Sequence, residues 1–280
     1  MKTLLVNADD FGFTRDVNSG IVEAHTRGIL TATTLMANGA AFDHAVVLAR
    51  ETPTLDVGCH LVLVGGESVV DGRAFPVTVG QMMRAVLLRR VNPYLELKAQ
   101  IERIVGAGLR PVHMDTHKHT HLFPPVLDAV ARLSKEFGIP WVRRPFDFPV
   151  AGPEARRRPE ACHTGGSSPL PQRMVAKAFG LVGPRMKRVL RENGCRSTDH
   201  FAGFSMTGRF TAVDVVALIH ALPEGSTEFM VHPGHCTAEL KAARTQLKES
   251  RAAELAALVA PEVRQALDEA GVRLSGYRAL

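Results

Sequence analysis

Aromatic residues are scarce in this sequence: they make up 6% of the 280 residues, and there is a single tryptophan. Proteins that bind single-stranded nucleic acids without sequence preference stack the bases on aromatic side chains. The sequence offers few such platforms and no lysine-rich stripe, although the formal net charge is +6 and the pI is about 9.4. We therefore expect a basic, solvated surface and no nucleic-acid partner.

Cysteine pairs and long apolar runs are also missing. The cysteines, Cys59, Cys162, Cys195 and Cys236, are widely separated and form no CxxC motif. Such spacing argues against a disulfide framework and favours reduced, mostly buried thiols. No apolar stretch is long enough for a membrane-spanning helix, and the apolar run in MKTLLVNADD (1–10) is too short for a signal peptide. These absences predict a cytoplasmic protein.

Short apolar, β-branched stretches alternate with longer helical patterns along the chain. This alternation predicts parallel βα units that close into a TIM-barrel-like (β/α) barrel, an α/β fold, as a single domain over residues 1–280. The proline-rich stretch 145–171 interrupts it and predicts an insertion or lid, because long loops inside a compact domain are usually functional. The expected strands are 3–10, 31–38, 55–63, 111–117, 139–145, 197–204, 226–234 and 272–277, and the expected helices include 17–28, 41–51, 93–108 and 124–138.

Polar side chains gather at the ends of these expected strands. The stretch HMDTHKHTHLFP (113–124) alone holds four histidines and an aspartate. In a barrel of parallel strands, all carboxyl ends lie on the face where active sites are built. A random scatter of the twelve histidines would not favour these ends. The residues expected there are Asp9, Asp10, His60, Asp115, His117, Arg143, Arg144, Asp199, His200 and His232.

Asp10, His60 and His117 together form a set of two histidines and one carboxylate. Such a triad leaves positions on a divalent ion open for water and substrate, as a catalytic metal requires. Taken singly, each histidine would more often be a hydrogen-bonded structural residue. In a regular strand Asp9 and Asp10 point to opposite sides, so we expect a turn that rotates one of them, and a cation would relieve their mutual repulsion. Three ligands from 113–117 are an alternative; we favour His117 alone, with its neighbours orienting it or contacting substrate.

The sequence resembles the YdjC/ChbG family of metal-dependent carbohydrate deacetylases in three ordered motifs: NADDFG (7–12), GCHLVL (58–63) and HMDTHKHTHLFP (113–124). The resemblance spans nearly the whole chain, since it continues through TATTLMANG (31–39), AFDHAV (41–46) and MVHPG (230–234). It implies a TIM-barrel-like fold and the removal of N-acetyl groups from amino sugars. It also implies metal ligands at Asp10, His60 and His117, a general base at Asp9 and a general acid at His232.

Two further segments, VRRPFD (142–147) and STDHFAGFSMTG (197–208), are similar to the hopanoid-biosynthesis-associated branch of this family. That similarity implies an N-acetylglucosaminyl hopanoid as the substrate. The proline-rich insertion departs from the compact disaccharide deacetylases, so their substrate does not transfer directly to this chain.

The expected reaction is hydrolysis of an acetamide with the help of one divalent ion, zinc or magnesium. We expect Arg143, Arg144, Asp115 and His119 to contact the substrate. Two other functions fit the same residues: a metal-dependent phosphodiesterase, which the basic charge favours, and a non-catalytic carbohydrate- or lipid-binding barrel. Acetate release against phosphate release from model substrates separates the two hydrolases.

The segment 174–193 mixes apolar and basic residues, and we expect Gly183–Pro184 to break it into two helical pieces. An ordinary barrel helix with one buried face and one basic face explains this pattern. The alternative is an apolar, cationic rim, shared with 145–171, that admits a lipid-linked amino sugar and contacts an anionic inner membrane surface. A homodimer is compatible with either interpretation.

Overall fold

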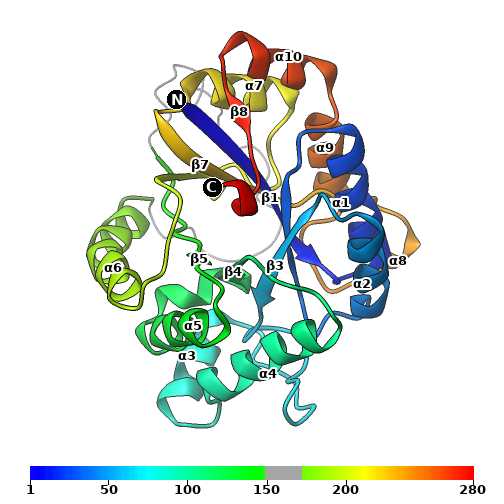
Figure 1. Cartoon of the computed structure of the whole chain (residues 1–280). Helices are drawn as coiled ribbons and strands as arrows, with labels where there is room; N and C mark the ends of the chain where they lie inside the picture. The colour runs from blue at the N-terminus through cyan, green and yellow to red at the C-terminus, as the bar shows by residue number, and fades with distance from the viewer. Residues whose placement is uncertain (149–171) are drawn as a thin grey trace.

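Eight parallel strands form one curved sheet with helices around it (Figure 1). The computed structural model describes residues 1–148 and 172–280, and the side chains of 1–148 and 182–280. Beyond its first four residues, the predicted insertion therefore lies outside the described residues. The strand order, β5-β4-β3-β2-β1-β7-β6 with β8 beside β1, confirms the predicted TIM-barrel-like α/β fold. The strands are β1 (Lys2–Phe11), β2 (Ala32–Leu35), β3 (Asp56–Leu61), β4 (His113–Thr116), β5 (Trp141–Val142), β6 (His200–Ala202), β7 (Gly225–Val231) and β8 (Arg273–Leu274).

The sheet closes between β5 and β6 through a short set of backbone contacts. Isolated parallel bridges pair Trp141 with Arg196 and Asp147 with Phe201. The Val142 N–H also donates a hydrogen bond to the Arg196 carbonyl at 2.9 Å. We call this junction the β5–β6 seam. It brings the two ends of the open strand order together and so completes the barrel.

The eighth strand differs from the expectation of eight equivalent strands. β7 pairs directly with β1 from Lys2 to Ala8, so β8 does not lie between them. β2 begins opposite Asn7, and β8 pairs on that side with the earlier residues Thr3 and Leu4. Because unpaired backbone groups in a buried sheet cost free energy, a two-residue strand is enough to complete the pairing of β1.

The helices cover the outside of the sheet (Figure 1). Several begin with the expected signals: Thr14 caps α1, Asn92 caps α4, and a proline opens α4 and α5. The sequence pattern did not predict α3, although Thr78 and Gln81 form a capping box at its start. The helices are α1 (Arg15–Arg27), α2 (Phe42–Glu51), α3 (Val79–Leu87), α4 (Pro93–Gly106), α5 (Pro124–Phe137), α6 (Gln172–Glu192), α7 (Ala212–Ala221), α8 (Ala238–Ala242), α9 (Glu249–Leu258) and α10 (Pro261–Glu269).

The predicted break in the segment 174–193 is wrong, because α6 continues through Pro184 without interruption. A proline inside a helix removes one backbone N–H and crowds the preceding turn, at a cost of about 3 kcal/mol. Contacts made after the proline offset this cost. Met186 and Leu190 are 0% and 2% exposed, and α6 packs against α5.

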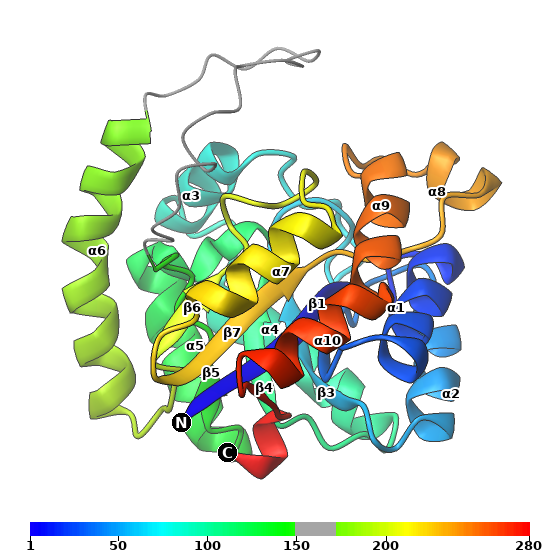
Figure 2. The same cartoon turned by 90° about the horizontal axis from the view of Figure 1, so that it is seen from above.

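The strands are buried on both faces, as expected for a parallel sheet covered by helices. All residues of β1 after Lys2 are buried. The carboxyl ends of the strands lie toward the upper side of Figure 2, and α3 lies on that side as well. Within the described part of the chain, none of the helices has the length and hydropathy that a membrane span requires.

Candidate active site

The carboxyl ends of β1, β3 and β4 bring the three predicted metal ligands together. Asp10 and His60 lie near the ends of β1 and β3, and His117 directly follows β4. The Oδ1 atom of Asp10 lies 3.4 Å from Nε2 of His60 and 3.3 Å from Nδ1 of His117. The two ring nitrogens are 3.3 Å apart. We call these three atoms the Asp–His–His triangle.

An irregularity in β1 makes this arrangement possible. The pairing of β1 with β2 shifts its register between Ala8 and Phe11, and Asp10 has a φ of +70°. Aspartate adopts this left-handed conformation more readily than most residues, and a bulge re-aims the side chains around it. One of the adjacent aspartates is rotated as predicted, but by an irregularity within β1 and not by a turn, since the strand continues to Phe11. Asp10 faces the two histidines, whereas Asp9 faces Arg143.

The triangle has the properties of a metal site. Oδ1 of Asp10 is buried and has no hydrogen-bond partner, which is unfavourable for a carboxylate oxygen unless a cation compensates it. Tetrahedral zinc with bonds of about 2.0–2.1 Å has ligand atoms roughly 3.4 Å apart. The edges of 3.3 and 3.4 Å match this spacing. The residues present therefore fit the predicted divalent ion.

A second group of candidate ligands, Asp9, His60 and Asp115, shares one histidine with the triangle. The Arg143 guanidinium is bound to both carboxylates of this group. A cation that already neutralises them leaves little attraction for a metal ion. The Asp–His–His triangle is therefore the better-placed group.

Asp115 orients His60. Its Oδ1 accepts a hydrogen bond from Nδ1 of His60 at 2.6 Å, and the Thr34 hydroxyl donates to its Oδ2 at 3.3 Å. A carboxylate behind a ligating imidazole fixes the tautomer in which the other nitrogen faces the metal. Burial would lower the pKa of His60, but the carboxylates around it, Asp115 first among them, raise that pKa to about 10. The site thus favours a positive charge at His60, which a metal ion would supply in place of the proton.

Arg143 joins three buried carboxylates. Its Nη1 and Nη2 donate to the two oxygens of Asp9, both at 2.7 Å. Nη1 also lies 2.5 Å from Oδ2 of Asp115, and Nε donates to Oε1 of Glu228 at 2.6 Å. Burial would raise the pKa of Asp9, but Arg143 and two nearby histidines hold it well below its usual value. Asp9 is therefore ionised at neutral pH.

Three of the predicted substrate contacts are bound to other groups of the protein. Arg143 and Asp115 bind each other and are nearly fully buried. Arg144 donates from Nη2 to the Asp199 carbonyl at 3.3 Å. The expectation that Asp199 and His200 end the sixth strand is wrong. His200 begins β6, because backbone pairing with β7 starts only there, and Asp199 accepts the N–H of the second residue of β7.

His119, the fourth predicted contact, lies beside aromatic side chains. Lys118 and His119 have φ values of +53° and +51°, so the chain turns sharply after β4. The ring centroid of His119 lies 5.4 Å from that of Phe204, which is 41% exposed, and 6.4 Å from that of Phe201. Nδ1 of His119 is buried without a hydrogen-bond partner. His119 and Phe204 thus form an aromatic group beside the turn after β4.

His232, the predicted general acid, directly follows β7. Its Nε2 lies 4.0 Å from Oδ2 of Asp9, and its Nδ1 is buried without a hydrogen-bond partner. Burial lowers the pKa of the ring to about 4, although the neighbouring aspartates oppose this effect. His232 is therefore neutral at pH 7 before a substrate is bound.

Helix α9 contributes two buried charged residues that the sequence analysis missed. Arg251, 1% exposed, contacts Oδ2 of Asp10 and so leaves Oδ1 to the triangle. Glu254, also 1% exposed, accepts the backbone N–H of His232 at 2.6 Å and that of Gly208 at 2.7 Å. Burial raises the pKa of Glu254 to about 7. The sequence feature that could have identified these two residues is their i, i+3 spacing, which places both on one side of the helix.

A comparison with known protein families matches the part of the chain that contains these site residues. The profile of the family described as YdjC-like protein matches residues 3–269. The chain belongs to the YdjC-like family. This match covers every residue of the triangle as well as Asp9, His232 and α9.

Several relatives of this YdjC-like chain carry the name of a deacetylase. A carbohydrate deacetylase of Geobacillus stearothermophilus is 32% identical over 279 residues, which cover 98% of this chain and 96% of that protein. A carbohydrate deacetylase of Brevibacillus brevis is 46% identical over 150 residues, or 52% of this chain and 60% of that protein. A chitooligosaccharide deacetylase of Salmonella paratyphi B is 41% identical over 145 residues, or 49% of this chain and 58% of that protein. The matched region thus spans little more than half the length of the last two relatives.

A solved structure supports the fold of this YdjC-like chain. It is the crystal structure of a protein of Enterococcus faecalis V583 with a suggested role in cellobiose-phosphate cleavage. The two share a TM-score of 0.75 at 24% identity over 99% of this chain and 98% of that one. At this identity the likeness concerns the fold alone.

Proposed function

We propose that this chain is a metal-dependent hydrolase that removes the acetyl group from an N-acetylated amino sugar. The observation that supports it most is the Asp–His–His triangle, with its unpartnered Asp10 oxygen. Asp9, an ionised carboxylate outside the triangle, lies beside it and is the other group that such a reaction needs. Relatives named as carbohydrate and chitooligosaccharide deacetylases agree with this chemistry.

A divalent ion held by Asp10, His60 and His117 would polarise the acetyl carbonyl and lower the pKa of a water molecule. Asp9 would accept a proton from a water molecule that attacks the carbonyl carbon. Arg143 keeps Asp9 ionised and fixes both of its oxygens, each at 2.7 Å. Oδ1 of Asp9 also accepts a hydrogen bond from Nδ2 of Asn7 at 3.2 Å, so Oδ2 is the oxygen that retains a lone pair for this proton.

Breaking the C–N bond requires a proton on the departing amine, and we assign its delivery to His232. The ring is neutral at rest, because its pKa is lowered to about 4. It must therefore gain a proton before it donates one. Asp9 lies 4.0 Å from Nε2 of His232 and is a nearby source of the proton taken from water. The products are acetate and a free amino sugar.

The sugar ring would rest against Phe204, the exposed aromatic side chain next to His119. Apolar faces of ligands pack on aromatic rings, while a few polar groups fix their orientation. His119 packs beside the Phe204 ring, with ring centroids 5.4 Å apart, and its side chain would border the same sugar. We propose these two residues as substrate contacts in place of Arg143 and Asp115.

The finer proposal is that the substrate is an N-acetylglucosaminyl hopanoid. It rests on the similarity of residues 142–147 and 197–208 to the hopanoid-associated branch. In the barrel these segments lie together, since Asp147 accepts the Phe204 N–H at 3.0 Å and the Ser205 N–H at 2.8 Å. These two segments therefore have a structural role in closing the sheet as well as the proposed role in substrate choice. The assay that follows separates the two.

The test is mass spectrometry for loss of an acetyl group from chito-oligosaccharides and N-acetylglucosaminyl lipids. The chain is first treated with a chelator and then supplied with zinc or magnesium in turn. We expect acetate release that depends on added metal and is absent in Asp10→Asn. Release of phosphate from phosphodiesters, with no acetate from any N-acetyl sugar, would instead establish the phosphodiesterase.

A further inference from the structure

The outward side of α3 and its flanking loops is both apolar and basic. Residues 70–95 carry six of the eleven large hydrophobic side chains that are exposed among the residues with described side chains. We define the α3 surface by these six residues and four exposed arginines. Its members are Val70, Val77, Met83, Leu87, Leu88, Leu95, Arg73, Arg84, Arg89 and Arg90.

Helix α3 exposes a pair of residues that a surface helix would normally make polar. Met82 and Val86, four positions apart, are 0% and 8% exposed and face the protein. Met83 and Leu87 follow on the adjacent side of the helix and are 36% and 67% exposed. A helix that packs with one side usually carries charged or polar residues on the other. Leu88, 50% exposed, extends the apolar region past the end of the helix.

The charge of the α3 surface is mainly positive, and Asp71 is the one acidic residue within 70–95. Residues 72–95 contain four arginines and no aspartate or glutamate. Arg73 lies 3.6 Å from Asp71, but among the described residues no carboxylate lies within ion-pair distance of Arg84, Arg89 or Arg90. Pairing of this surface with its own copy across a two-fold axis would bring like charges together. The charge therefore favours an anionic partner over a second copy of the chain.

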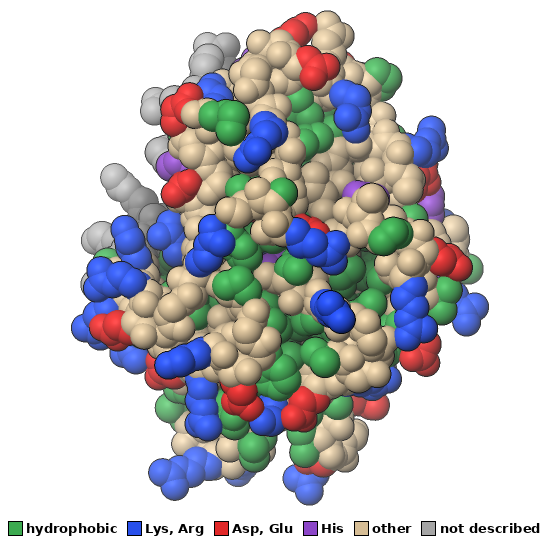
Figure 3. All heavy atoms as spheres, in the orientation of Figure 1, with side chains coloured by type: hydrophobic (Ala, Val, Ile, Leu, Met, Phe, Trp, Pro, Cys, Tyr) green, Lys and Arg blue, Asp and Glu red, His purple; other side chains and the backbone are tan. Residues whose placement is uncertain are grey.

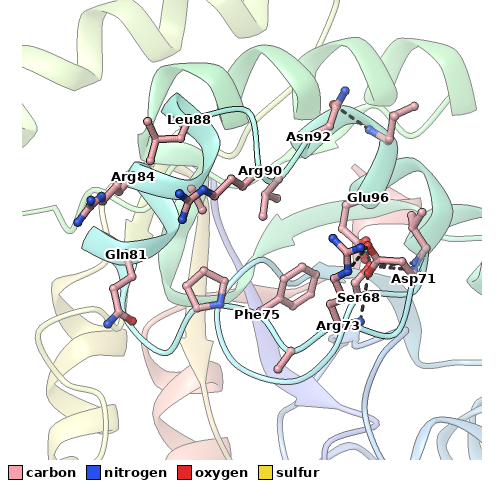
Figure 4. Close-up of a pocket in the computed structure, with 16 residues that line it drawn as sticks. Ser68, Asp71, Arg73, Phe75, Gln81, Arg84, Leu88, Arg90, Asn92 and Glu96 are labelled. Atoms are coloured by element: carbon pink, nitrogen blue, oxygen red, sulfur yellow. Dashed lines mark hydrogen bonds and ion pairs between the residues drawn. The ribbon is translucent and has the colours of Figure 1, made fainter.

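A cavity of about 710 Å³ opens between α3, the loop before it and the start of α4 (Figure 4). Phe75, Leu88 and Leu95 contribute apolar lining, and Arg84 and Arg90 extend to the same side of the view. Figure 3 shows hydrophobic side chains between the basic groups along the lower edge of the molecule, where α3 and this loop lie. The cavity is thus lined by apolar side chains and arginines, with the carboxylates of Asp71 and Glu96 near Arg73.

We propose that the α3 surface binds an anionic lipid bilayer. Exposed apolar side chains next to arginines are the combination that holds a protein in the membrane interface, with the apolar groups among the acyl chains and the cations at the phosphates. α3 lies on the same side of the barrel as the carboxyl ends of the strands (Figure 2). Binding through this surface turns the active-site side toward the bilayer. The proposal does not depend on the deacetylase activity, because binding needs no substrate.

The test is cosedimentation of the whole chain with vesicles of phosphatidylcholine alone or with added phosphatidylglycerol. We expect binding to the anionic vesicles only, and weaker binding as salt rises. Removing three arginines, in Arg84→Gln/Arg89→Gln/Arg90→Gln, should reduce the affinity about a hundredfold, or about fivefold for each arginine. The α6 control, Arg185→Gln/Arg188→Gln/Arg191→Gln, removes the same charge from exposed positions of the segment 174–193, the alternative membrane contact, and so separates the two surfaces.

A second pair of variants tests the apolar contribution. Leu87→Gln should weaken vesicle binding, whereas Val213→Gln on α7, which replaces a side chain 68% exposed, should not. Thermal denaturation checks that each variant is folded. Absence of binding to either vesicle, or an equal loss in the α6 control, overturns the proposal. A concentration-dependent dimer that Leu87→Gln abolishes, without vesicle binding, would assign the surface to a second copy.

Discussion

Replacing Arg143 by methionine tests the electrostatic design of the active site. The guanidinium is bound to Asp9, Asp115 and Glu228, all of them buried. Removing one partner of a buried ion pair costs about 3–5 kcal/mol, because the remaining charge is left without compensation. Since three carboxylates lose their shared cation here, we expect the upper part of that range for the loss in free energy of unfolding at neutral pH.

The loss should depend on pH in a defined direction. With Arg143 present, the pKa of Asp9 is held below its unfolded value, so its contribution to stability exists at neutral pH and is lost only as the pH falls through that low pKa. Without Arg143, burial dominates and the pKa of Asp9 rises above the unfolded value, as burial already raises those of Asp115 and Glu228. In the Arg143→Met variant, protonation of these carboxylates then removes the uncompensated buried charge and restores part of the free energy of unfolding. Its deficit relative to the wild type should shrink on acidification by up to about 1.4 kcal/mol per pH unit for each proton taken up.

The assay is urea denaturation of both proteins, in chelator, at several values between about pH 8 and about pH 5.5. Arg144→Met is the matched control: its guanidinium binds the Asp199 carbonyl, and among the described residues it forms no ion pair with the three buried carboxylates. We expect it to cost less than about 1 kcal/mol at every pH. A deficit for Arg143→Met that is constant with pH, or an equal deficit for Arg144→Met, would refute the electrostatic account.

Three further predictions concern the metal and the substrate. A divalent ion at a hundred times its Kd should stabilise the folded wild type by about 2.7 kcal/mol. Thermal denaturation should show this as a rise in Tm on addition of the metal. His60→Ala should still fold, but its Tm should not rise with the metal. Asp9→Asn should keep that rise but lower turnover by about 10²–10⁴ in the acetate assay; loss of the rise would make Asp9 a ligand. Phe204→Ala should raise KM by about two- to tenfold with little change in kcat, and an unchanged KM would place the sugar elsewhere.

The sequence predicted the parts of the site that follow from strand ends. Asp10, His60 and His117 could be placed together because parallel strands share one carboxyl face. A rotation of one of the two adjacent aspartates was also predicted, because a regular strand would point them to opposite sides. Their roles in catalysis stay predictions until the variants are measured.

The features that the sequence did not predict depend on how the helices and strands pack against one another in the fold. Arg251 and Glu254 belong to a helix whose charged residues would ordinarily be solvated. The packing of α9 against α1 and α7 buries them and brings Arg251 to Asp10. The predicted helix break at Pro184 failed for a related reason, because tertiary contacts stabilise a continuous helix that the local sequence would interrupt. The length of β8 was set by the stretch of β1 that β2 leaves unpaired.

The β5–β6 seam has a consequence for how the molecule loses activity. A few isolated bridges and hydrogen bonds close the barrel there, whereas β1 has paired neighbours on both sides. Regions with few backbone hydrogen bonds open locally at a lower free energy than the centre of a sheet. Arg143 sits on the chain just after β5, so opening at the seam carries it away from Asp9. The amides of Val142 and Phe148 should therefore exchange with solvent before those of β1, and heating should inactivate the protein while most of its barrel is still folded.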